Sequence, residues 1–310
     1  MGVMRSVLLA GSESAWLRER ATRWPFVRRA TRRFMPGERL EDALEAARGL
    51  GRQGLATILT HLGENVTTEA EAAQVTEAYV TAQQQVVGAG VDAEMSVKLT
   101  QLGLDQDAET SYRNLKRIAD HAATLGKTVW IDMEGSAYTD VTLDLYRRIR
   151  REQPNVGVAV QAYLRRTGAD LDTLIALGSA IRLVKGAYKE PASIAFSTRA
   201  EVDESFFQLG VRLLGEEARR AGVFLGLGTH DPALIRRLEA HAAAHGIPKD
   251  TFEFEMLYGI RREEQLRLAR AGYRIRVLIS YGEFWFPWYM RRLAERPANV
   301  WFVVKNLFAG

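Results

Sequence analysis

The chain of 310 residues contains no cysteine, which excludes disulfide bonds, thiolate metal sites and cysteine nucleophiles. Long hydrophobic runs are missing as well, since none approaches the roughly 20 residues that a helix needs to cross a bilayer. The segment 1–13 has only a short apolar stretch before charges return, so no secretory signal is expected. We therefore expect a cytoplasmic protein that is not embedded in a membrane.

A large excess of charge of one sign is also absent, because the formal net charge is only +4. The charge is uneven, however: residues 1–40 carry nine arginines against three glutamates, a local +6 that leaves −2 for the remainder. The segment 24–34 interleaves aromatic residues with arginine, which is typical either of a helix at a membrane or anionic surface or of a solvated helix that covers one end of a domain. Nucleic-acid binding is not expected, because the basic excess is confined to this arm.

Eight short apolar runs alternate with stretches of helical periodicity, and each run ends in a residue that can do chemistry. The runs are 56–64, 94–100, 128–134, 156–162, 181–188, 224–230, 252–258 and 274–282. This repeat predicts an α/β fold, a (β/α)₈ barrel of the TIM type over residues 53–310, preceded by an N-terminal helical arm over 1–52. In such barrels the loops after the strands build the active site.

Several helices between the strands can be placed from their ends. Helices are predicted over 68–87, 110–125, 139–151 and 200–221. Thr68 followed by Glu71 is a capped helix start, and Asp231-Pro232 begins the helix after the sixth strand. The segment after Pro287 is predicted to be the eighth helix.

Charged residues gather at the ends of the second and third strands. Ser96 and Lys98 share one strand face, and so do Asp132 and Glu134 on the neighbouring strand. Two readings stay open: the acids share a proton for acid–base work, or one carboxylate simply holds Lys98 in place.

The fifth and sixth strands carry the densest polar pattern. A buried Arg182 beside Lys185 and Gly186 suits an anionic or electron-rich planar ligand, although a salt-bridge network would give the same pattern. Thr229 and the helix start after it could hold a phosphate. His230 is predicted to be the only histidine at the end of a strand, so a metal site is not expected.

Arginine and aromatic residues are concentrated near the predicted eighth helix. Arg291 and Arg292 could clamp a carboxylate, or form a solvated pair in which Arg291 contacts Glu295. The aromatics between 281 and 289 could roof a small apolar ring or pack in the core.

The heptad Arg182-Leu183-Val184-Lys185-Gly186-Ala187-Tyr188 makes the reading specific. Together with Lys98, Asp132, Thr229-His230 and Arg291-Arg292-Leu293, it resembles proline dehydrogenase, in its monofunctional bacterial form. The resemblance runs from about residue 54 to 297. It implies a (β/α)₈ barrel that binds FAD non-covalently and oxidises L-proline.

The resemblance also implies roles for single residues. Lys98, Arg291 and Arg292 would bind the proline carboxylate, Tyr188 and Leu257 would shape the ring pocket, and Glu64 would be a gate that pairs with Arg291. Arg182 would lie near flavin N5, and Asp132 would orient Lys98. The residues expected to line FAD are Met133, Gln161, Val184, Lys185, Gly186, Ala187, Thr229 and His230.

The reaction implied is hydride transfer from proline C5 to flavin N5, which gives Δ1-pyrroline-5-carboxylate in the first step of proline catabolism. A membrane quinone would accept the electrons, so transient contact at the inner face of the membrane is expected. Pyrroline-5-carboxylate dehydrogenase would be a separate protein. The sequence departs from longer relatives at Lys189, Asp231 and Trp288, which affects the packing expected around FAD.

Two other function classes compete with this reading. A Schiff-base lyase would use Lys98 or Lys185 as a desolvated nucleophile. A non-catalytic barrel would serve as a binding module, but it would make the aligned polar strand ends a coincidence.

Overall fold

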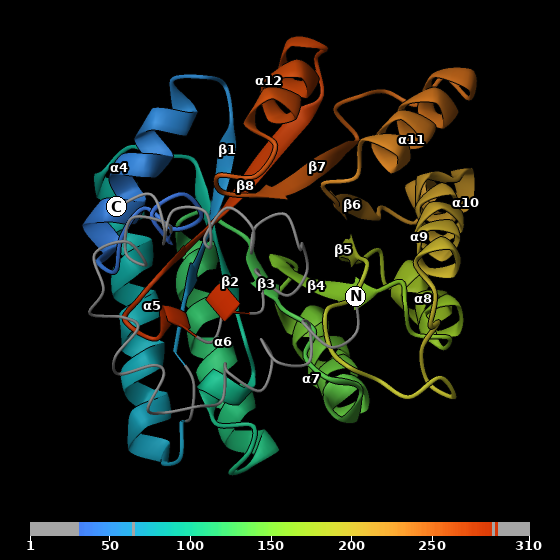
Figure 1. Cartoon of the computed structure of the whole chain (residues 1–310). Coiled ribbons are helices and arrows are strands. Elements are labelled where there is room, and N and C mark those ends of the chain that lie inside the picture. Colours follow the sequence, from blue (N-terminus) through green and yellow to red (C-terminus); the bar gives the residue numbers. More distant parts are fainter. Residues whose placement is uncertain (1–30, 64–65, 287–288, 291–310) are drawn as a thin grey trace, which may run out of the picture.

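The computed structural model describes residues 31–63, 66–286 and 289–290. Its centre is a closed barrel of eight parallel strands in sequential order, in which β1 pairs with β8. Figure 1 shows the strands as a ring with helices around it. The strands are β1 (Ala56–His61), β2 (Ala93–Val97), β3 (Val129–Ile131), β4 (Val156–Gln161), β5 (Ala180–Val184), β6 (Phe224–Gly228), β7 (Phe252–Leu257) and β8 (Arg274–Tyr281). The predicted (β/α)₈ fold is confirmed, and each strand begins within one residue of its predicted start.

The described helices cover the outside of the barrel, the first before β1 and the others after strands β1 to β7. They are α4 (Leu40–Gly51), α5 (Glu69–Gly88), α6 (Ala108–Thr124), α7 (Thr139–Glu152), α8 (Thr167–Ala176), α9 (Arg199–Leu214), α10 (Glu216–Arg220), α11 (Pro232–Ala244) and α12 (Arg262–Arg270). Two 3₁₀ turns, η1 (Thr100–Leu102) and η2 (Ser136–Tyr138), follow β2 and β3.

The predicted helix ends are largely confirmed. The Thr68 side chain accepts a hydrogen bond from the Glu71 amide at 3.2 Å in a full capping box, and Asp231 caps α11 through the Ala233 amide at 3.0 Å. The single helix predicted over 200–221 is wrong, because Gly215 adopts an extended backbone and divides it into α9 and α10. Glycine is a weak helix former, which explains the break at this position.

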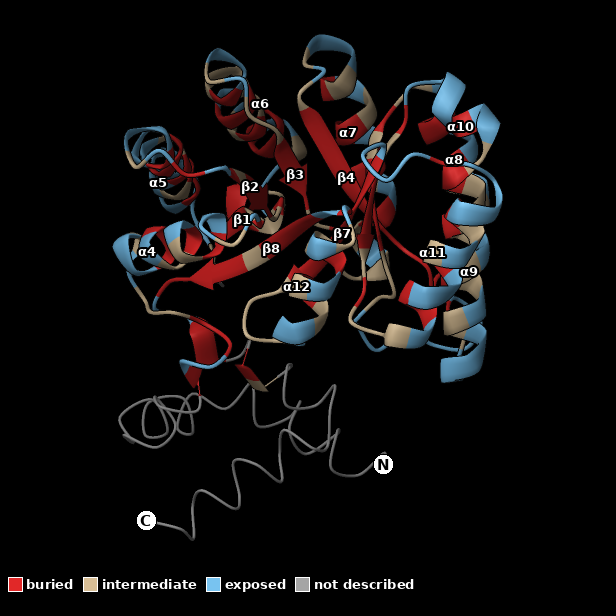
Figure 2. Ribbon diagram, turned by 90° about the horizontal axis from the view of Figure 1, so that it is seen from above, coloured by how far each residue is buried: buried red, intermediate tan, exposed pale blue. Residues whose placement is uncertain are grey.

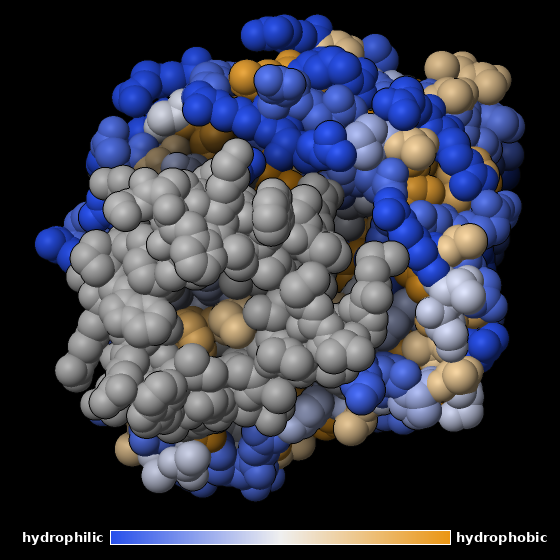
Figure 3. All heavy atoms as spheres, viewed as in Figure 1, coloured by the Kyte–Doolittle hydropathy of each residue, from blue (hydrophilic) through white to orange (hydrophobic). Residues whose placement is uncertain are grey.

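The apolar core lies between the strands and the helices. Leu183 of β5, Leu227 of β6 and Leu238 of α11 are buried and converge on Gly210 of α9. Figure 2 shows the strands and the inward helix faces as buried and the outward faces as exposed. On the face in Figure 3, the described surface is mainly hydrophilic, with scattered hydrophobic residues. Parallel strands covered on both sides read as near-continuous apolar runs, as this sequence does.

The inside of the barrel is polar near the amino ends of its strands. Arg276 of β8 donates from Nε to Glu253 of β7 at 2.8 Å and lies 3.5 Å from Glu94 of β2. Trp130 of β3 donates from Nε1 to Glu94 at 2.6 Å. Its ring packs on Gly157, where a Cβ atom would lie 2.6 Å from the indole. These charges are buried but paired, which is the condition for keeping them in a core.

No helix in the described ranges is long and apolar enough to cross a membrane. The basic arm lies outside the described residues up to residue 30, as does the predicted eighth helix for the most part. The proposed boundary of the arm at residue 52 follows the end of α4 by one residue, and it stays a prediction.

Replacing Arg276 with Met should strongly destabilise the barrel, because Glu253 and Glu94 would then lack their buried cation. Removing one partner of a buried pair costs about 3–5 kcal/mol. Arg274→Met is the matched control on the same strand, since Arg274 is half exposed and lies 3.9 Å from Glu253. It should cost less than about 1 kcal/mol. Urea unfolding of both variants tests this, and equal losses would contradict it.

Candidate active site

The Asp132 carboxylate is the centre of a polar cluster at the carboxyl ends of β2, β3 and β5. The Asp132 amide donates to the Val97 carbonyl at 2.8 Å, which extends the β2–β3 ladder and fixes the residue at the barrel mouth. Its Oδ1 accepts from the Ser96 hydroxyl at 2.6 Å and from Arg182 Nη1 at 3.0 Å, while Oδ2 accepts from Lys98 Nζ at 2.8 Å. One carboxylate therefore joins side chains from three strands.

Lys98 and Asp132 keep each other charged. Burial opposes the charge on Lys98, but the Asp132 carboxylate, together with Tyr188 and Tyr79, outweighs burial and raises the pKa of the ammonium above its usual value. Burial alone would raise the pKa of Asp132, but Lys98 and Arg182 outweigh it and lower that pKa. Of the two readings left open by the sequence, the structure favours a carboxylate that orients Lys98.

Glu134 has separate partners. It accepts from the Thr100 amide at 3.2 Å and from the Thr100 hydroxyl at 2.8 Å, and burial raises its pKa. Gln161 donates to the Glu134 carbonyl at 2.7 Å, and the Gln161 carbonyl accepts from Thr167. The bond from Gln161 ties the loop after β3 to β4. Met133, the residue between Asp132 and Glu134 in this loop, is buried.

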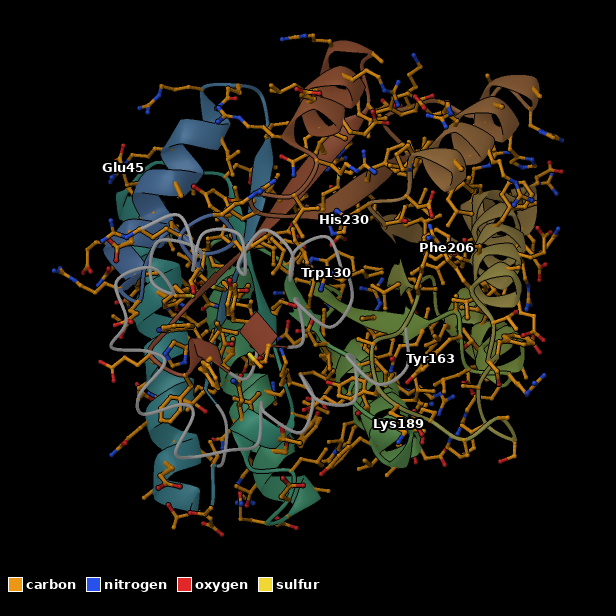
Figure 4. The ribbon with its side chains drawn as sticks, in the orientation of Figure 1. Glu45, Trp130, Tyr163, Lys189, Phe206 and His230 are labelled. Atoms are coloured by element: carbon orange, nitrogen blue, oxygen red, sulfur yellow. The ribbon has the colours of Figure 1, made fainter. Side chains whose placement is uncertain are left out.

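Arg182 is buried inside the barrel, with 4% of its surface exposed. Nη1 donates to Ser96 Oγ at 2.9 Å as well as to Asp132, and Nε lies 2.5 Å from Glu255 Oε2. The guanidinium carbon stands 4.6 Å from the ring centroid of Trp130. Figure 4 shows Trp130 within the ring of strands. Nε and Nη2 are buried donors without a hydrogen-bond partner of good geometry among the described residues, although Nε keeps its ion pair with Glu255.

Glu255 of β7 is the partner that sequence reasoning missed. The run Phe252–Leu257 places Glu253 and Glu255 on one face by the two-residue period of a strand, and this signal could have pointed to inward carboxylates. The pairing itself could not be predicted, because β5 and β7 are separated by β6 in the barrel.

The loop after β5 is held in place over the site. Gly186 has φ +107°, and a Cβ there would lie within 2.2 Å of the Tyr163 ring, so only glycine fits. Glu190 accepts from the Ser136 amide at 2.7 Å and from the Ser136 hydroxyl at 2.6 Å, which ties this loop to η2. Tyr188 lies between these two anchors and is 37% exposed. Ala187, next to it, is also exposed.

A second charged cluster lies beside the start of α11. Lys185 is paired with Asp203 of α9 and lies 3.3 Å from Asp231, which also accepts from Arg199 at 2.7 Å. Burial would raise the pKa of Asp231, but the Arg199 and Lys185 cations outweigh it and lower the pKa to about 2. Thr229 is buried in front of this cluster, and its hydroxyl accepts from the Asp231 amide at 3.2 Å.

His230 lies two residues after the end of β6, at the mouth of the barrel, and Figure 4 labels it there. The prediction that it is the only histidine at a strand end is wrong, because β1 ends at His61 and not at residue 64. His61 packs against Tyr79 and Tyr281, and burial lowers its pKa. It is therefore neutral near pH 7.

The remaining predicted residues divide into two groups. Val184 and Leu257 are the last residues of β5 and β7 and are partly buried. Glu64, Arg291 and Arg292 lie outside the described residues, as does Trp288.

The aromatics near the end of β8 are mostly core. Tyr281, Trp285, Phe286 and Tyr289 are buried, whereas Phe284 is 44% exposed. Trp285 donates from Nε1 to Glu38 at 2.8 Å, which fixes this segment against the chain before α4. For the buried four, the packing interpretation is therefore the one that the structure supports.

The arrangement can bind a small anion but is unsuited to imine formation. A protonated Lys98 with one donor used by Asp132 has further donors for a carboxylate. A Schiff-base nucleophile must be a neutral amine, and the raised pKa of Lys98 opposes this. Lys185 is held between two carboxylates. The lyase reading is therefore disfavoured.

Comparison with known proteins identifies the family. The family model Proline dehydrogenase matches residues 43–305. Proline dehydrogenase 1 of Bacillus subtilis subsp. natto is 39% identical over 306 residues, which cover 98% of this chain and 99% of that protein. Proline dehydrogenase of Deinococcus radiodurans is 37% identical over 283 residues, 90% of each chain.

Solved structures share the fold. Proline utilization A from Bdellovibrio bacteriovorus, inactivated by N-propargylglycine, superposes with a TM-score of 0.81 at 21% identity. The match covers 94% of this chain but only 36% of that longer chain. At this identity the likeness supports the barrel alone. The family match and the full-length relatives carry the assignment: the chain belongs to the proline dehydrogenase family.

Proposed function

We propose that this chain oxidises L-proline to Δ1-pyrroline-5-carboxylate with a non-covalently bound FAD, which when bound supplies the hydride acceptor for proline C5 at flavin N5. The observation that carries the proposal is the Asp132 cluster, which sets the Lys98 ammonium and the Arg182 guanidinium side by side at the barrel mouth. The Lys98 ammonium suits a substrate carboxylate. The Arg182 guanidinium suits a flavin, which gains negative charge when it accepts hydride.

The residues present fit a flavin. Arg182 Nη2 is a buried donor that lacks a partner among the described residues, and a flavin ring offers acceptor atoms for such a donor. Residues from β3 to β6 would hold the cofactor around it: Met133, Gln161, Val184, Lys185, Gly186, Ala187, Thr229 and His230. A hydroxyl such as that of Thr229, near the start of α11, suits a phosphate.

Lys98 would bind the carboxylate of L-proline. Asp132 holds the ammonium in one orientation and keeps it protonated, so that its other donors meet the substrate. Arg291 and Arg292 would complete the carboxylate site as bidentate donors. Tyr188 and Leu257 would form the apolar wall of the ring pocket.

Arg182 and Asp132 would act on the chemical step. A fixed cation aimed at developing negative charge lowers the barrier without reorganisation, and Arg182 is buried and held on two sides. Asp132 is assigned an orienting role, because its lowered pKa makes it a weak base. Glu64 would close over the site by pairing with Arg291 and so exclude water.

The proposal includes a membrane quinone as the final electron acceptor, and therefore a cytoplasmic protein that visits the inner face of the membrane. The basic aromatic segment 24–34 is the proposed contact. A separate pyrroline-5-carboxylate dehydrogenase would consume the product.

The function is tested by the visible spectrum of the purified protein, recorded before and after L-proline is added without oxygen. A yellow flavin absorption band that bleaches with L-proline is expected, because hydride transfer reduces the flavin. A flavin band that L-proline leaves unchanged would contradict the substrate. Protein that stays colourless after incubation with FAD would contradict the cofactor.

Replacing Lys98 with Met should raise KM for L-proline, because a charged hydrogen bond to the carboxylate is lost. Such bonds contribute about 1.5–3 kcal/mol, which corresponds to an increase in KM of roughly tenfold to hundredfold. The control is Lys127→Met, since Lys127 pairs with Asp92 before β3, away from the barrel mouth. Steady-state kinetics of both variants decide, and a Lys98→Met enzyme with unchanged KM would remove this residue from the substrate site.

Membrane contact can be tested on vesicles that contain anionic lipid. Changing Arg28, Arg29, Arg32 and Arg33 to Gln should weaken binding, because each basic residue near an anionic surface contributes about 1 kcal/mol. Changing the exposed Arg117, Arg151, Arg219 and Arg220 is the charge-matched control. Co-sedimentation measures both sets, and equal binding by the first set and the parent would contradict docking through the arm.

A further inference from the structure

We propose that Glu255 is a positioning residue for proline oxidation, which with Gly226 anchors the Nε side of Arg182 and leaves Nη2 as the amino group for the flavin. The inference rests on the proposed function, since it assigns Arg182 to the cofactor. It adds a residue from β7 that reaches the Asp132 cluster through Arg182.

Arg182 is fixed at two of its three nitrogens. Ser96 and Asp132 accept from Nη1 on one side, and Glu255 lies 2.5 Å from Nε on the other. A guanidinium is planar and rigid, so fixing two nitrogens fixes the third. Without Glu255 the group could rotate about its bonds to Asp132, and Nη2 would lose its defined direction.

Gly226 is what allows the pair to form. Arg182 of β5 is the register partner of Gly226 on β6, and Gly226 is in turn the register partner of Glu253 on β7. Strand β6 therefore lies between the two charged residues. A Cβ at position 226 would lie 2.1 Å from Glu255 Oε1, so any side chain there would displace the carboxylate. The Glu255 carboxylate occupies the space that a side chain at position 226 would fill.

The pair is a costly arrangement for stability alone. Both residues are 4% exposed, and among the described residues neither the Glu255 oxygens nor Arg182 Nε has a hydrogen-bond partner of good geometry, so an ion pair with an Nε–Oε2 distance of 2.5 Å is what joins them. Removing two charges from water often costs as much as their attraction returns. A role in holding Arg182 accounts for the presence of this buried pair.

The charge of Glu255 responds to pH. Burial raises its pKa to about 7, against the opposing effect of Arg182. The other charged groups that face it are Glu253 on its own strand, Arg276 on β8 and Glu94 on β2. A carboxylate that ionises near pH 7 beside Arg182 makes reduction of a neighbouring group to an anion less favourable above that pH. Below pH 7 the effect disappears as Glu255 takes up its proton.

The test uses the flavin-loaded protein and four variants. Glu255→Leu and Gly226→Ala both remove the anchor, and each should slow flavin reduction at saturating L-proline by at least about tenfold, because small misplacements of an active-site group are costly. KM should stay within about threefold, since the substrate carboxylate site is untouched. Glu255→Gln keeps an acceptor for Nε and should recover most of the rate. Glu253→Gln is the control, because it removes a buried carboxylate from the same strand that pairs with Arg276 instead.

The midpoint potential of the bound flavin is the second measurement. Glu255→Gln should raise the potential relative to the parent at pH 8, where Glu255 is ionised, and leave it unchanged at pH 5.5. If Glu255→Leu fails to fold, Gly226→Ala carries the test of the rate, because it displaces the Glu255 carboxylate without removing it.

The outcomes separate the two proposals. If L-proline reduces the parent while Glu255→Leu and Gly226→Ala are reduced at the parent rate, the positioning role is overturned. If the potential of Glu255→Gln matches the parent at both pH values, the effect of the Glu255 charge on the flavin is overturned. If L-proline does not reduce the parent, the proposed function is overturned and this inference with it.

Discussion

The bridge that the Asp132 carboxylate makes between Lys98 and Arg182 is the interaction on which the site depends. It joins residues from β2, β3 and β5, and only a closed barrel brings these strand ends to one mouth. Each cation would be expensive to bury alone, and the shared Asp132 anion lowers the cost of burying both. The carboxylate thus fixes two positive groups at positions where repulsion between them would otherwise drive them apart.

The inside of the barrel continues this alternation of charge. Arg182 meets Glu255 on the side away from Lys98, and Arg276 meets Glu253 and Glu94 nearer the amino ends of the strands. Apolar packing therefore holds the outside of the sheet against the helices, while ion pairs fill its inside. Small residues make room for these groups, as Gly226 does for Glu255. The apolar packing closes the barrel. The ion pairs define the barrel mouth, where an enzyme of proline catabolism does its chemistry.

The sequence was sufficient for the fold, because eight buried parallel strands leave apolar runs that helices interrupt. It was sufficient for the Lys98–Asp132 contact as well, since both residues end neighbouring strands. It could not reveal the partner of Arg182, because Glu255 lies two strands away, where the space left by Gly226 on the intervening strand lets the two side chains meet. The break at Gly215 and the early end of β1 at His61 were missed for a local reason: periodicity locates elements better than it locates their ends.

A crystal structure of the chain with FAD and a proline analogue that cannot be oxidised would test the account most directly. The account predicts that Arg182 still bridges Asp132 and Glu255, that its Nη2 donates to the flavin, and that Lys98 contacts the carboxylate of the analogue. A flavin bound away from Arg182, or an Arg182 that leaves both carboxylates to reach it, would contradict the account.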